Sequence, residues 1–459
     1  MTEVEVRTVL MVRRSDRSMI VRAVWAIGAA VALFVCSHGQ AHAHANAGID
    51  SIDVIRSNEG TRIGLETTVG YLRSRDGEKY RWTCHETVTQ GDAVMTPRYT
   101  ESAQGVVLVT VGDLDQARQI DESMYRTEDG CNWSAPEGLT DNQIVAVAFD
   151  PNDEMNVIAA TGNDDGANRV YRSVDAGLSW SETDLVFEDR EFRTIRFSRG
   201  PAGALWVTAV RHETEEAWVY RSPDGGVSWS EHPVEVQSAD GLDVFVDVLV
   251  ADFEDPNTAW VVMGPFLDDR LLKTTDGGAS FAEVYAFDGD IIDGAQDADG
   301  GIWLVTNEGS VVHGPAGGEF APVDGAPQSV GIQADGNQII LATRVAGERT
   351  TMATSTDGRT FEAVDVFAVT TGPPVCSPQS DSAQICTSLW WDLWERIASD
   401  GDEDTGLVGD TASSNPLATD TGCCSGNAKH SSVGLVFLTL FGIGRRRSQG
   451  SHPAGVTPP

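Results

Sequence analysis

Acidic side chains are the most abundant groups in this sequence that could carry out chemistry. Asp243, Asp247 and Asp252 gather near one expected strand, and Asp290 and Asp293 gather near another. Two carboxyl groups can act as general acid and base, but the chain has 69 Asp and Glu residues, which favours a solvated acidic surface. The sequence has no His-Glu-x-x-His, no Gly-x-Ser-x-Gly and no phosphate-cradling loop. No complete catalytic constellation is therefore indicated.

Neither a metal site nor a nucleic-acid surface is indicated. The run from Asn163 to Gly166 is similar to part of a calcium loop but lacks the remaining spaced acids, so it is interpreted as a turn. No Cys-x-x-Cys occurs, and no histidine stands at zinc-ligand spacing from a cysteine. The formal net charge of -37 repels phosphate backbones. We expect no metal, no cofactor and no nucleic-acid partner.

One short motif recurs through the middle of the chain and indicates what positions these side chains. Its full form is S/T-x-D-x-G-x-S/T-W/F, and neighbouring copies lie 40 to 53 residues apart. Counting full, shortened and degraded copies, the motif occurs seven times. Its aspartate position is filled by Asp76, Asp129, Asp175, Asp224, Asp276 and Asp357 in six copies and by Ala316 in the remaining one. The aromatic residues that end the clearest copies are Trp133, Trp180, Trp229, Phe281 and Phe361. Seven copies at this period predict the seven blades of a β-propeller.

The residue types in the motif suit a tight turn between two strands. Asp and Ser or Thr side chains bond nearby backbone amides, the glycines adopt positive φ, and the aromatic ring packs between sheets. The motif resembles the Asp-box, or BNR, repeat of sialidases and many other propellers, where the box joins the third and fourth strands of a blade. The resemblance implies an all-β, seven-bladed propeller in which the box is structural.

Strand and helix patterns agree with that architecture. Residues 143–149, 157–160, 169–173 and 179–186 form four short β-rich runs within one period. After the last motif copy, residues 375–397 predict a short amphipathic helix, because apolar residues recur every four positions, at Ile385, Leu389, Leu393 and Ile397. Blades can bury both faces of each sheet only against one another. We therefore expect one domain over residues 46–398.

The sialidase resemblance implies a catalytic set that can be sought residue by residue: a tyrosine-glutamate pair, an acid/base aspartate and three arginines that grip a carboxylate. The family's Phe-Arg-Ile-Pro-type segment is missing, because Phe192 to Ile195 lacks the proline and lies in mid-chain. Three arginines fall on or near expected innermost strands, at Arg98, Arg193 and Arg344. Paired or solvated arginines are the more common explanation.

Most of the seven tyrosines are interpreted as packing residues. Four of them stand just before a motif copy, at Tyr71, Tyr125, Tyr171 and Tyr220, and Tyr80 lies within one. This leaves only Tyr99 and Tyr285 as candidates for a nucleophile. Enzyme activity is therefore left open, with non-catalytic binding favoured over hydrolysis.

The first 45 residues have the order of a secretory signal. Several arginines precede an apolar stretch over 23–36, and small residues follow around Ala43 and Ala45, where we expect cleavage. About fourteen apolar residues are fewer than the roughly twenty that a spanning helix needs. An N-terminal membrane anchor stays as the alternative.

A second sorting pattern lies at the C-terminus. An acidic Asp/Thr/Gly/Ser-rich linker over 399–422 precedes a segment over 423–459 that contains Cys423, Cys424, an apolar run and the cluster Arg445, Arg446 and Arg447. This order resembles the MYXO-CTERM tail of myxobacterial and related surface proteins. The resemblance implies export, processing near the two cysteines and retention at the outer surface of a Gram-negative cell, or release from it.

Four cysteines belong to the expected folded body. Export would permit disulfides, and the candidates are Cys84, Cys131, Cys376 and Cys386. Cys376 could pair with Cys386 across a short polar loop, and Cys84 with Cys131 between neighbouring blades. Four cysteines allow three pairings, and the sequence does not choose among them.

The favoured hypothesis is a secreted, surface-anchored, monomeric propeller that acts as a binding or adhesion module. Its ligand would be an unknown protein or glycan, and association with the outer membrane or cell surface would come from the C-terminal segment. The main alternative is a sialidase-type glycoside hydrolase that uses the axial pocket. A third is an extracytoplasmic factor that helps to assemble protein complexes.

Overall fold

The structure, a computed structural model, describes most of the region between residues 51 and 399. The described ranges are 51–56, 62–75, 77–89, 95–113, 123–139, 142–163, 166–198, 203–211, 216–235, 244–265, 268–344 and 350–399. Several predicted features lie outside these residues: the signal segment, the linker, Asp76, Asp243, and the sorting segment with Cys423, Cys424, Arg445, Arg446 and Arg447.

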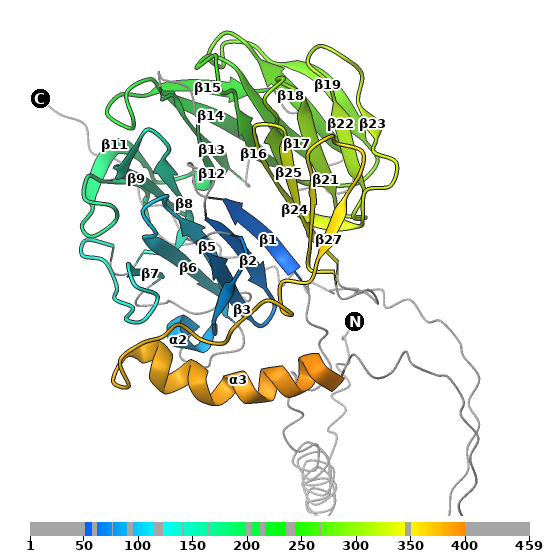
Figure 1. Ribbon diagram of the computed structural model, residues 1–459. Coiled ribbons are helices and arrows are strands. Elements are labelled where there is room, and N and C mark those ends of the chain that lie inside the picture. The colour runs from blue at the N-terminus through cyan, green and yellow to red at the C-terminus, as the bar shows by residue number, and fades with distance from the viewer. Residues whose placement is uncertain are drawn as a thin grey trace, which may run out of the picture. The chain divides into compact units, whose positions relative to one another are not determined.

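Seven antiparallel sheets stand side by side around an axis, and the structure confirms the predicted seven-bladed β-propeller (Figure 1). Blade 1 comprises β1 Ser51–Arg56, β2 Ile63–Thr67, β3 Gly70–Ser74 and β4 Tyr80–Thr83. Blade 2 comprises β5 Met95–Glu101, β6 Val107–Asp113 and β7 Met124–Thr127. Blade 3 comprises β8 Ile144–Asp150, β9 Asp153–Thr161, β10 Asn168–Ser173 and β11 Ser181–Phe187. Blade 4 comprises β12 Glu191–Phe197, β13 Leu205–Arg211, β14 Glu216–Ser222 and β15 Ser230–Val234. Blade 5 comprises β16 Val244–Ala251, β17 Ala259–Pro265, β18 Asp269–Thr274 and β19 Ala282–Phe287. Blade 6 comprises β20 Ile291–Gln296, β21 Ile302–Thr306, β22 Val311–Gly314 and β23 Ala321–Pro322. Blade 7 comprises β24 Ser329–Asp335, β25 Gln338–Thr343, β26 Met352–Ser355 and β27 Glu362–Val364.

Each blade uses consecutive strands. The first strand of each blade lies nearest the axis, where its residues line a central cavity. Blade 2 differs from the others, because its sheet has three strands and continues only as an isolated bridge between Arg126 and Ser134. The sixth blade forms although Ala316 replaces the motif aspartate. Its outer strand β23 is short, at two residues.

Apolar side chains of the middle strands are buried between neighbouring blades, which is why these strands read as nearly continuous apolar runs. In blade 4, for example, β13 is buried along almost its whole length, and Trp206 is fully buried. Separate core clusters fill successive gaps around the ring, such as the one in which Val219 of blade 4 meets Val261 of blade 5. The core is therefore a set of interfaces between sheets.

The innermost strands are irregular. In six of the seven, the pairing with the second strand shifts register, as between Ser51 and Asp53 in β1 and between Ile291 and Asp293 in β20. Such bulges change the direction in which a side chain points and are frequent at barrel rims. Here they accompany the two aspartates that line the axial cavity described below.

The motif aspartates form the predicted hydrogen bonds in turns between the third and fourth strands. Asp224 Oδ1 accepts hydrogen bonds from the amides of Val227 at 3.2 Å and Ser228 at 2.8 Å, and its Oδ2 accepts one from the Ser228 hydroxyl at 2.6 Å. Gly225 and Gly226 have φ of 67° and 94°, which favours glycine. We call this arrangement an aspartate turn; it recurs at Asp129, Asp175, Asp276 and Asp357.

The ring closes without exchanging a strand between its first and last blades. Instead, the segment after β27 runs beside β4 of blade 1: the Trp82 amide donates to the Gly372 carbonyl at 3.0 Å, and the Thr371 amide donates to the Tyr80 carbonyl at 3.0 Å. Tyr80 and Thr370 form a parallel bridge. We call residues 365–399 the strap, because they join blade 7 to blades 1 and 2.

Two disulfides fix the strap. Cys84 bonds to Cys386, and Cys131 bonds to Cys376, at sequence separations of 302 and 245 residues. All four candidate cysteines therefore pair, but the two suggested pairings, Cys84 with Cys131 and Cys376 with Cys386, are wrong. Each bond joins an early blade to the strap, because the strap crosses the outer edge of blade 1 before its helix begins.

The predicted terminal helix is present as α3 Asp381–Ser399, and a single helical turn, α2 Glu86–Thr89, lies next to it (Figure 1). Trp390 and Leu393 pack into the core cluster between blades 7 and 1. Asp381 accepts a hydrogen bond from the Trp133 amide at 3.0 Å. Among the helices that the structure describes, none is long and apolar enough to cross a membrane.

Candidate functional site

The inner strands of all seven blades line an axial cavity of about 270 Å³. Its polar lining includes Asp53 of β1, Arg196 of β12, and Asp293 and Gln296 of β20. Aliphatic and aromatic residues such as Phe149 complete the wall. The cavity is slightly smaller than typical small-molecule sites, which span roughly 300–1,000 Å³, so it suits one sugar ring or one side chain.

Asp53 and Asp293 approach the inner strand of blade 7 from its two sides. Asp293 Oδ2 accepts a hydrogen bond from the Ile332 amide at 2.7 Å. Asp53 lies against Gly331, where a Cβ would stand 2.6 Å from Asp53 Oδ1, so glycine makes room for the carboxyl group. Burial, followed by the charges of Asp293 and Glu66, raises the pKa of Asp53 well above its usual value. Burial also raises the pKa of Asp293.

A third buried carboxyl group stands behind Asp53. Glu66 accepts hydrogen bonds from Arg98 at 3.0 Å and from the Tyr99 amide at 3.2 Å. Burial outweighs these contacts and raises the pKa of Glu66 to about 7. Glu66 is therefore partly protonated close to neutral pH, and in its protonated form it can donate as well as accept a hydrogen bond.

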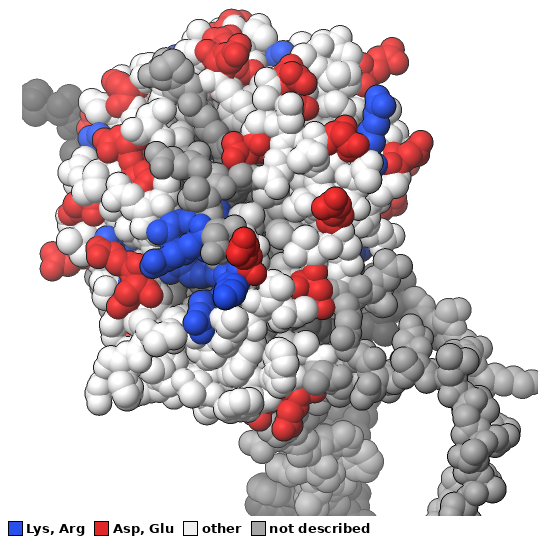
Figure 2. Space-filling model, viewed as in Figure 1, with Lys and Arg blue, Asp and Glu red and all other residues white. Residues whose placement is uncertain are grey.

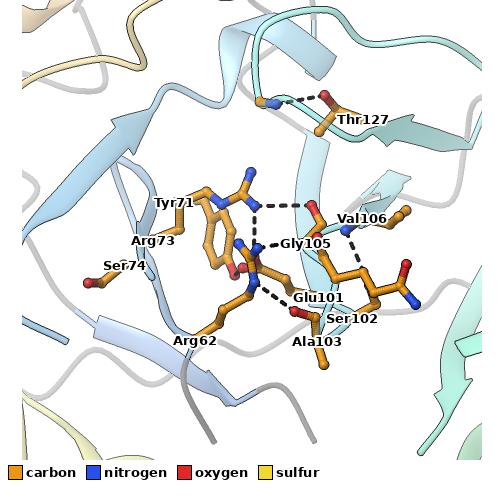
Figure 3. A network of polar contacts seen from close by, with 12 residues as sticks. Arg62, Tyr71, Arg73, Ser74, Glu101, Ser102, Ala103, Gly105, Val106 and Thr127 are labelled. Atoms are coloured by element: carbon orange, nitrogen blue, oxygen red, sulfur yellow. Dashed lines mark hydrogen bonds and ion pairs between the residues drawn. The ribbon is translucent and has the colours of Figure 1, made fainter. Parts of the chain in front are cut away.

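A polar network joins blades 1 and 2 beside the cavity (Figure 3). Glu101 accepts hydrogen bonds from the Tyr71 hydroxyl at 2.8 Å and from Arg73 at 2.7 Å, and Arg62 lies 3.5 Å away. Arg62 also donates to the Ala103 carbonyl at 2.8 Å. The network contains a tyrosine-glutamate pair and two arginines, but Tyr71 is 1% exposed. It therefore serves to hold the turn after β5 in place.

This network was missed by sequence reasoning. Tyr71 was interpreted as a packing residue, and it does stack on Tyr99 with ring centroids 4.5 Å apart. Its hydroxyl group nevertheless needs a partner, because a buried phenol without one is costly. The buried Glu101 and its two arginines lie 28 to 39 residues apart along the chain, so no local spacing signals their contact.

The three arginines proposed to grip a substrate carboxylate do not converge. Arg98 forms an ion pair with Glu66. Arg193 forms a bidentate ion pair with Asp247, in which Nε donates to Oδ1 at 2.9 Å and a terminal guanidinium nitrogen donates to Oδ2 at 3.0 Å. Arg344 donates to the Asn307 carbonyl at 2.6 Å. Each arginine thus binds a group of the protein itself.

Of the two tyrosines left as nucleophile candidates, Tyr99 lines the axial cavity and Tyr285 does not. Tyr99 is 6% exposed, its hydroxyl lies 3.0 Å from His85 Nδ1, and burial raises its pKa well above the usual value. Tyr285 belongs to the outer strand β19 and stacks on Phe320 at 5.0 Å. The structure does not bring the two tyrosines together at the axis.

The remaining candidate carboxylates have separate partners. Asp247 pairs with Arg193, and Asp252 accepts hydrogen bonds from the Glu254 and Asp255 amides at 2.9 and 2.8 Å. Asp290 accepts one from the Asn307 side chain at 2.9 Å. Within the described ranges, no group of three or more His, Cys, Asp or Glu side chains is arranged to hold a metal ion. Of the four singled-out carboxylates that the structure describes, Asp247, Asp252, Asp290 and Asp293, only Asp293 lines the axial cavity.

A larger groove of about 680 Å³ lies between blades 4 and 5, away from the axis. One wall comes from β15, with His232 and Val234, and the other from blade 5, with Arg270 and Phe281. Sequence reasoning did not foresee this groove, because it depends on how far two neighbouring blades diverge. Figure 2 shows acidic side chains spread over one face of the protein and a concentration of basic ones over blades 1 and 2.

Comparisons with known proteins add little beyond the fold. No family model matches the chain, and no curated protein matches its sequence. An ancestral GH74 enzyme aligns at 17% identity and TM-score 0.40, over 54% of this chain and 34% of that one. The extracellular domain of a putative one-component system from B. thetaiotaomicron aligns at 14% identity and TM-score 0.45, over 68% and 39%.

PorZ, a surface component of the type IX secretion system of Porphyromonas gingivalis, aligns at 10% identity and TM-score 0.44, over 69% of this chain and 38% of that one. The chain thus spans less than two fifths of the length of each of these three proteins. Identities this low do not transfer an activity, since one fold supports many functions.

Proposed function

We propose that this chain is an exported Asp-box propeller that acts as a binding module, with a polar ligand entering the axial cavity. The observation that carries the proposal is the pairing of the arginines. Arg98, Arg193 and Arg344 each bind a carboxylate or carbonyl group of the protein. An anion-gripping triad would have to give up those contacts, whereas binding a hydroxyl-rich ligand does not require it.

The chemistry of the cavity favours a glycan. Asp53 and Asp293 place two carboxyl groups in the lining, and burial raises the pKa of both. Sugar hydroxyls both donate and accept hydrogen bonds, and mixed donor and acceptor groups match them. Gln296 and Gln333 add amide groups of both kinds. A cavity of about 270 Å³ accommodates a terminal sugar unit rather than a long chain.

Export is supported by the two disulfides, since such bonds persist in oxidising compartments. We further propose that the segment over 423–459 retains the monomer at the outer membrane or cell surface, with the linker over 399–422 as a spacer. An acidic domain on such a spacer would present the axial opening to partners outside the cell. Cys423 and Cys424 would be the processing site.

A glycan array with the purified full chain, its disulfides intact, tests the proposal. We expect at least one glycan to bind, and Asp293→Asn to weaken that binding by about tenfold, because an amide nitrogen that can only donate replaces a carboxyl oxygen that can accept a hydrogen bond. Asp299→Asn is the matched control, because Asp299 is exposed and lies in the turn after β20 of the same blade. Incubation with fluorogenic glycosides, sialosides among them, tests the hydrolase alternative. Turnover of any of them would overturn the assignment as a non-catalytic module.

A further inference from the structure

We propose that the groove between blades 4 and 5 binds an extended basic peptide segment of a partner protein. The inference rests on the proposed role as a binding module and adds a second site away from the axis. The groove of about 680 Å³ is larger than the axial cavity of about 270 Å³ and shares none of its lining residues. The two sites can therefore be tested separately.

The length of the groove suits an extended chain. Its lining reaches from Gly278 and Ser280, in the turn after β18, to Gly264 and Asp268, at the other end of that strand. β18 has six residues, which at about 3.3 Å per residue gives roughly 20 Å. At the end of the groove next to the turn after β18, blades 4 and 5 lie close together, since a Cβ on Gly278 would lie 2.9 Å from the His232 ring. An extended peptide of about six residues matches this length.

The groove has an apolar floor. Val234, Met263, Leu272 and Phe281 line it, and all four belong to or pack against the core cluster between blades 4 and 5. Phe281 stands at the motif position that Trp180 fills in blade 3, where the indole is 9% exposed. Phe281 is only partly buried, so part of its ring is open to the groove. Apolar side chains on one face of a peptide could be buried there.

The charges at the rim favour a cationic partner. Arg270 lies 3.0 Å from Asp268 and 3.6 Å from Glu283, so two carboxylates face one guanidinium group. Exposed Glu235 adds a further negative charge. Burial, followed by the charge of Arg221, lowers the pKa of His232, which leaves the imidazole uncharged near neutral pH. The lining thus carries a net negative charge, which complements lysine or arginine side chains.

The walls also offer a backbone edge. β15 and β19 are the outer strands of their sheets, and among the described strands each pairs with one neighbour only. An extended peptide can add to such an edge through main-chain hydrogen bonds while its side chains enter pockets. Because β15 borders the groove directly, its edge and the apolar floor can engage the same peptide.

Fluorescence anisotropy with the full chain tests the proposal. The probe is a fluorescein-labelled, amidated hexapeptide of alternating leucine and lysine, and the comparison probe replaces each lysine with glutamate. We expect the lysine peptide to bind at least tenfold more tightly, with affinity falling as salt is added. Equal binding of the two peptides, or no binding of either, would overturn the proposal.

Two substitutions locate the site. Glu235→Lys should weaken binding of the lysine peptide about fivefold, whereas Glu362→Lys, which makes the same charge change on outer strand β27 of blade 7, should not. Phe281→Trp should fill the floor and weaken binding about fivefold without lowering the melting temperature. Equal effects of the two lysine variants would show that net charge alone attracts the peptide and would refute the groove as its binding site.

The axial site gives an independent readout. Glycan binding that is sensitive to Asp293→Asn, together with no preference for the lysine peptide, would refute the groove and leave the proposed function intact. Binding of the lysine peptide that is sensitive to Glu235→Lys, with no glycan bound, would support the groove and refute the axial ligand.

Discussion

Cys84, which directly follows the outer strand of blade 1, is bonded to Cys386 of helix α3, 302 residues further along the chain. With the bond from Cys131 to Cys376, this link is the covalent part of ring closure. The noncovalent part consists of backbone hydrogen bonds between β4 and the strap and the packing of α3 into the core. The ring is therefore held shut from its outer edge.

Removing the Cys84–Cys386 bond should destabilise the whole domain. The double variant Cys84→Ala with Cys386→Ala should lower the free energy of unfolding by about 3 kcal/mol, because a long loop in the unfolded chain is no longer constrained. Denaturant titration followed by tryptophan fluorescence measures the change. The Cys131→Ala with Cys376→Ala pair provides a comparison for the second link. An unchanged unfolding midpoint in both would contradict a closing role for the strap.

Asp224→Ala should lower stability without changing any binding. The substitution removes the acceptor for the Val227 and Ser228 amides and for the Ser228 hydroxyl. The expected loss is about 1 kcal/mol, typical of a side chain that caps backbone amides. Thermal unfolding and the glycan array measure the two properties. A loss of glycan binding in a variant that is still folded would show that the aspartate turns do more than support the blades.

Arg73→Met should destabilise the contact between blades 1 and 2. Glu101 would keep its hydrogen bond from Tyr71 and the more distant Arg62, but it would lose its closest cation, Arg73, at 2.7 Å. A buried carboxylate with fewer partners should lower the free energy of unfolding by about 2 kcal/mol. Arg75→Met, at an exposed position, is the control. If the Glu101→Gln background leaves the effect of Arg73→Met unchanged, the two residues are not coupled.

Asp269→Asn should change how stability depends on pH. Asp269 is fully buried, its Oδ2 accepts the Ile291 amide, and its Oδ1 has no hydrogen-bond partner among the described residues. Burial raises its pKa to about 7. The contribution of this group is most favourable below the unfolded pKa near 4 and declines as the pH rises toward 7. At pH 8 the variant should exceed the wild type by about 2 kcal/mol, and at pH 4 the advantage should vanish. Parallel pH profiles would refute this assignment.

Replacing both Cys423 and Cys424 with serine should release the protein into the medium. The expectation follows from the sorting pattern in the sequence, because processing near these cysteines is what would retain the chain at the surface. Immunoblots of cells and culture supernatant measure the distribution. Serine at the upstream Cys36, within the expected signal segment, is the control for cysteine loss. Unchanged retention of the double variant would rule out the anchor.

The seven-bladed ring was predictable because its signal is local and repeated. The motif has a fixed order of Asp, Gly and Ser or Thr, and a full, shortened or degraded copy of it occurs once per blade, so even the sixth blade with Ala316 could be counted. The terminal helix was predictable for the same reason, since its apolar residues recur every four positions. Both features are properties of short segments.

The disulfide pairing and the axial cavity were not predictable in this way. Whether Cys84 meets Cys131 or Cys386 depends on where the strap crosses blade 1, which no local pattern encodes. Asp293 was one of many candidate carboxylates, and its place at the axis depends on a bulge in β20. Asp53 was not singled out at all, although a bulge brings it to the same cavity. Such contacts arise only when all seven sheets are in place.

The use of consecutive strands for every blade has a consequence for biogenesis. Each sheet can form as soon as its own stretch of chain has been synthesised. Cys84 and Cys131, however, must persist as thiols until the strap that carries Cys376 and Cys386 has followed. An early oxidant would meet those two cysteines first and could join them in a bond that the native fold lacks. Maturation should therefore depend on a thiol isomerase that reshuffles this premature link.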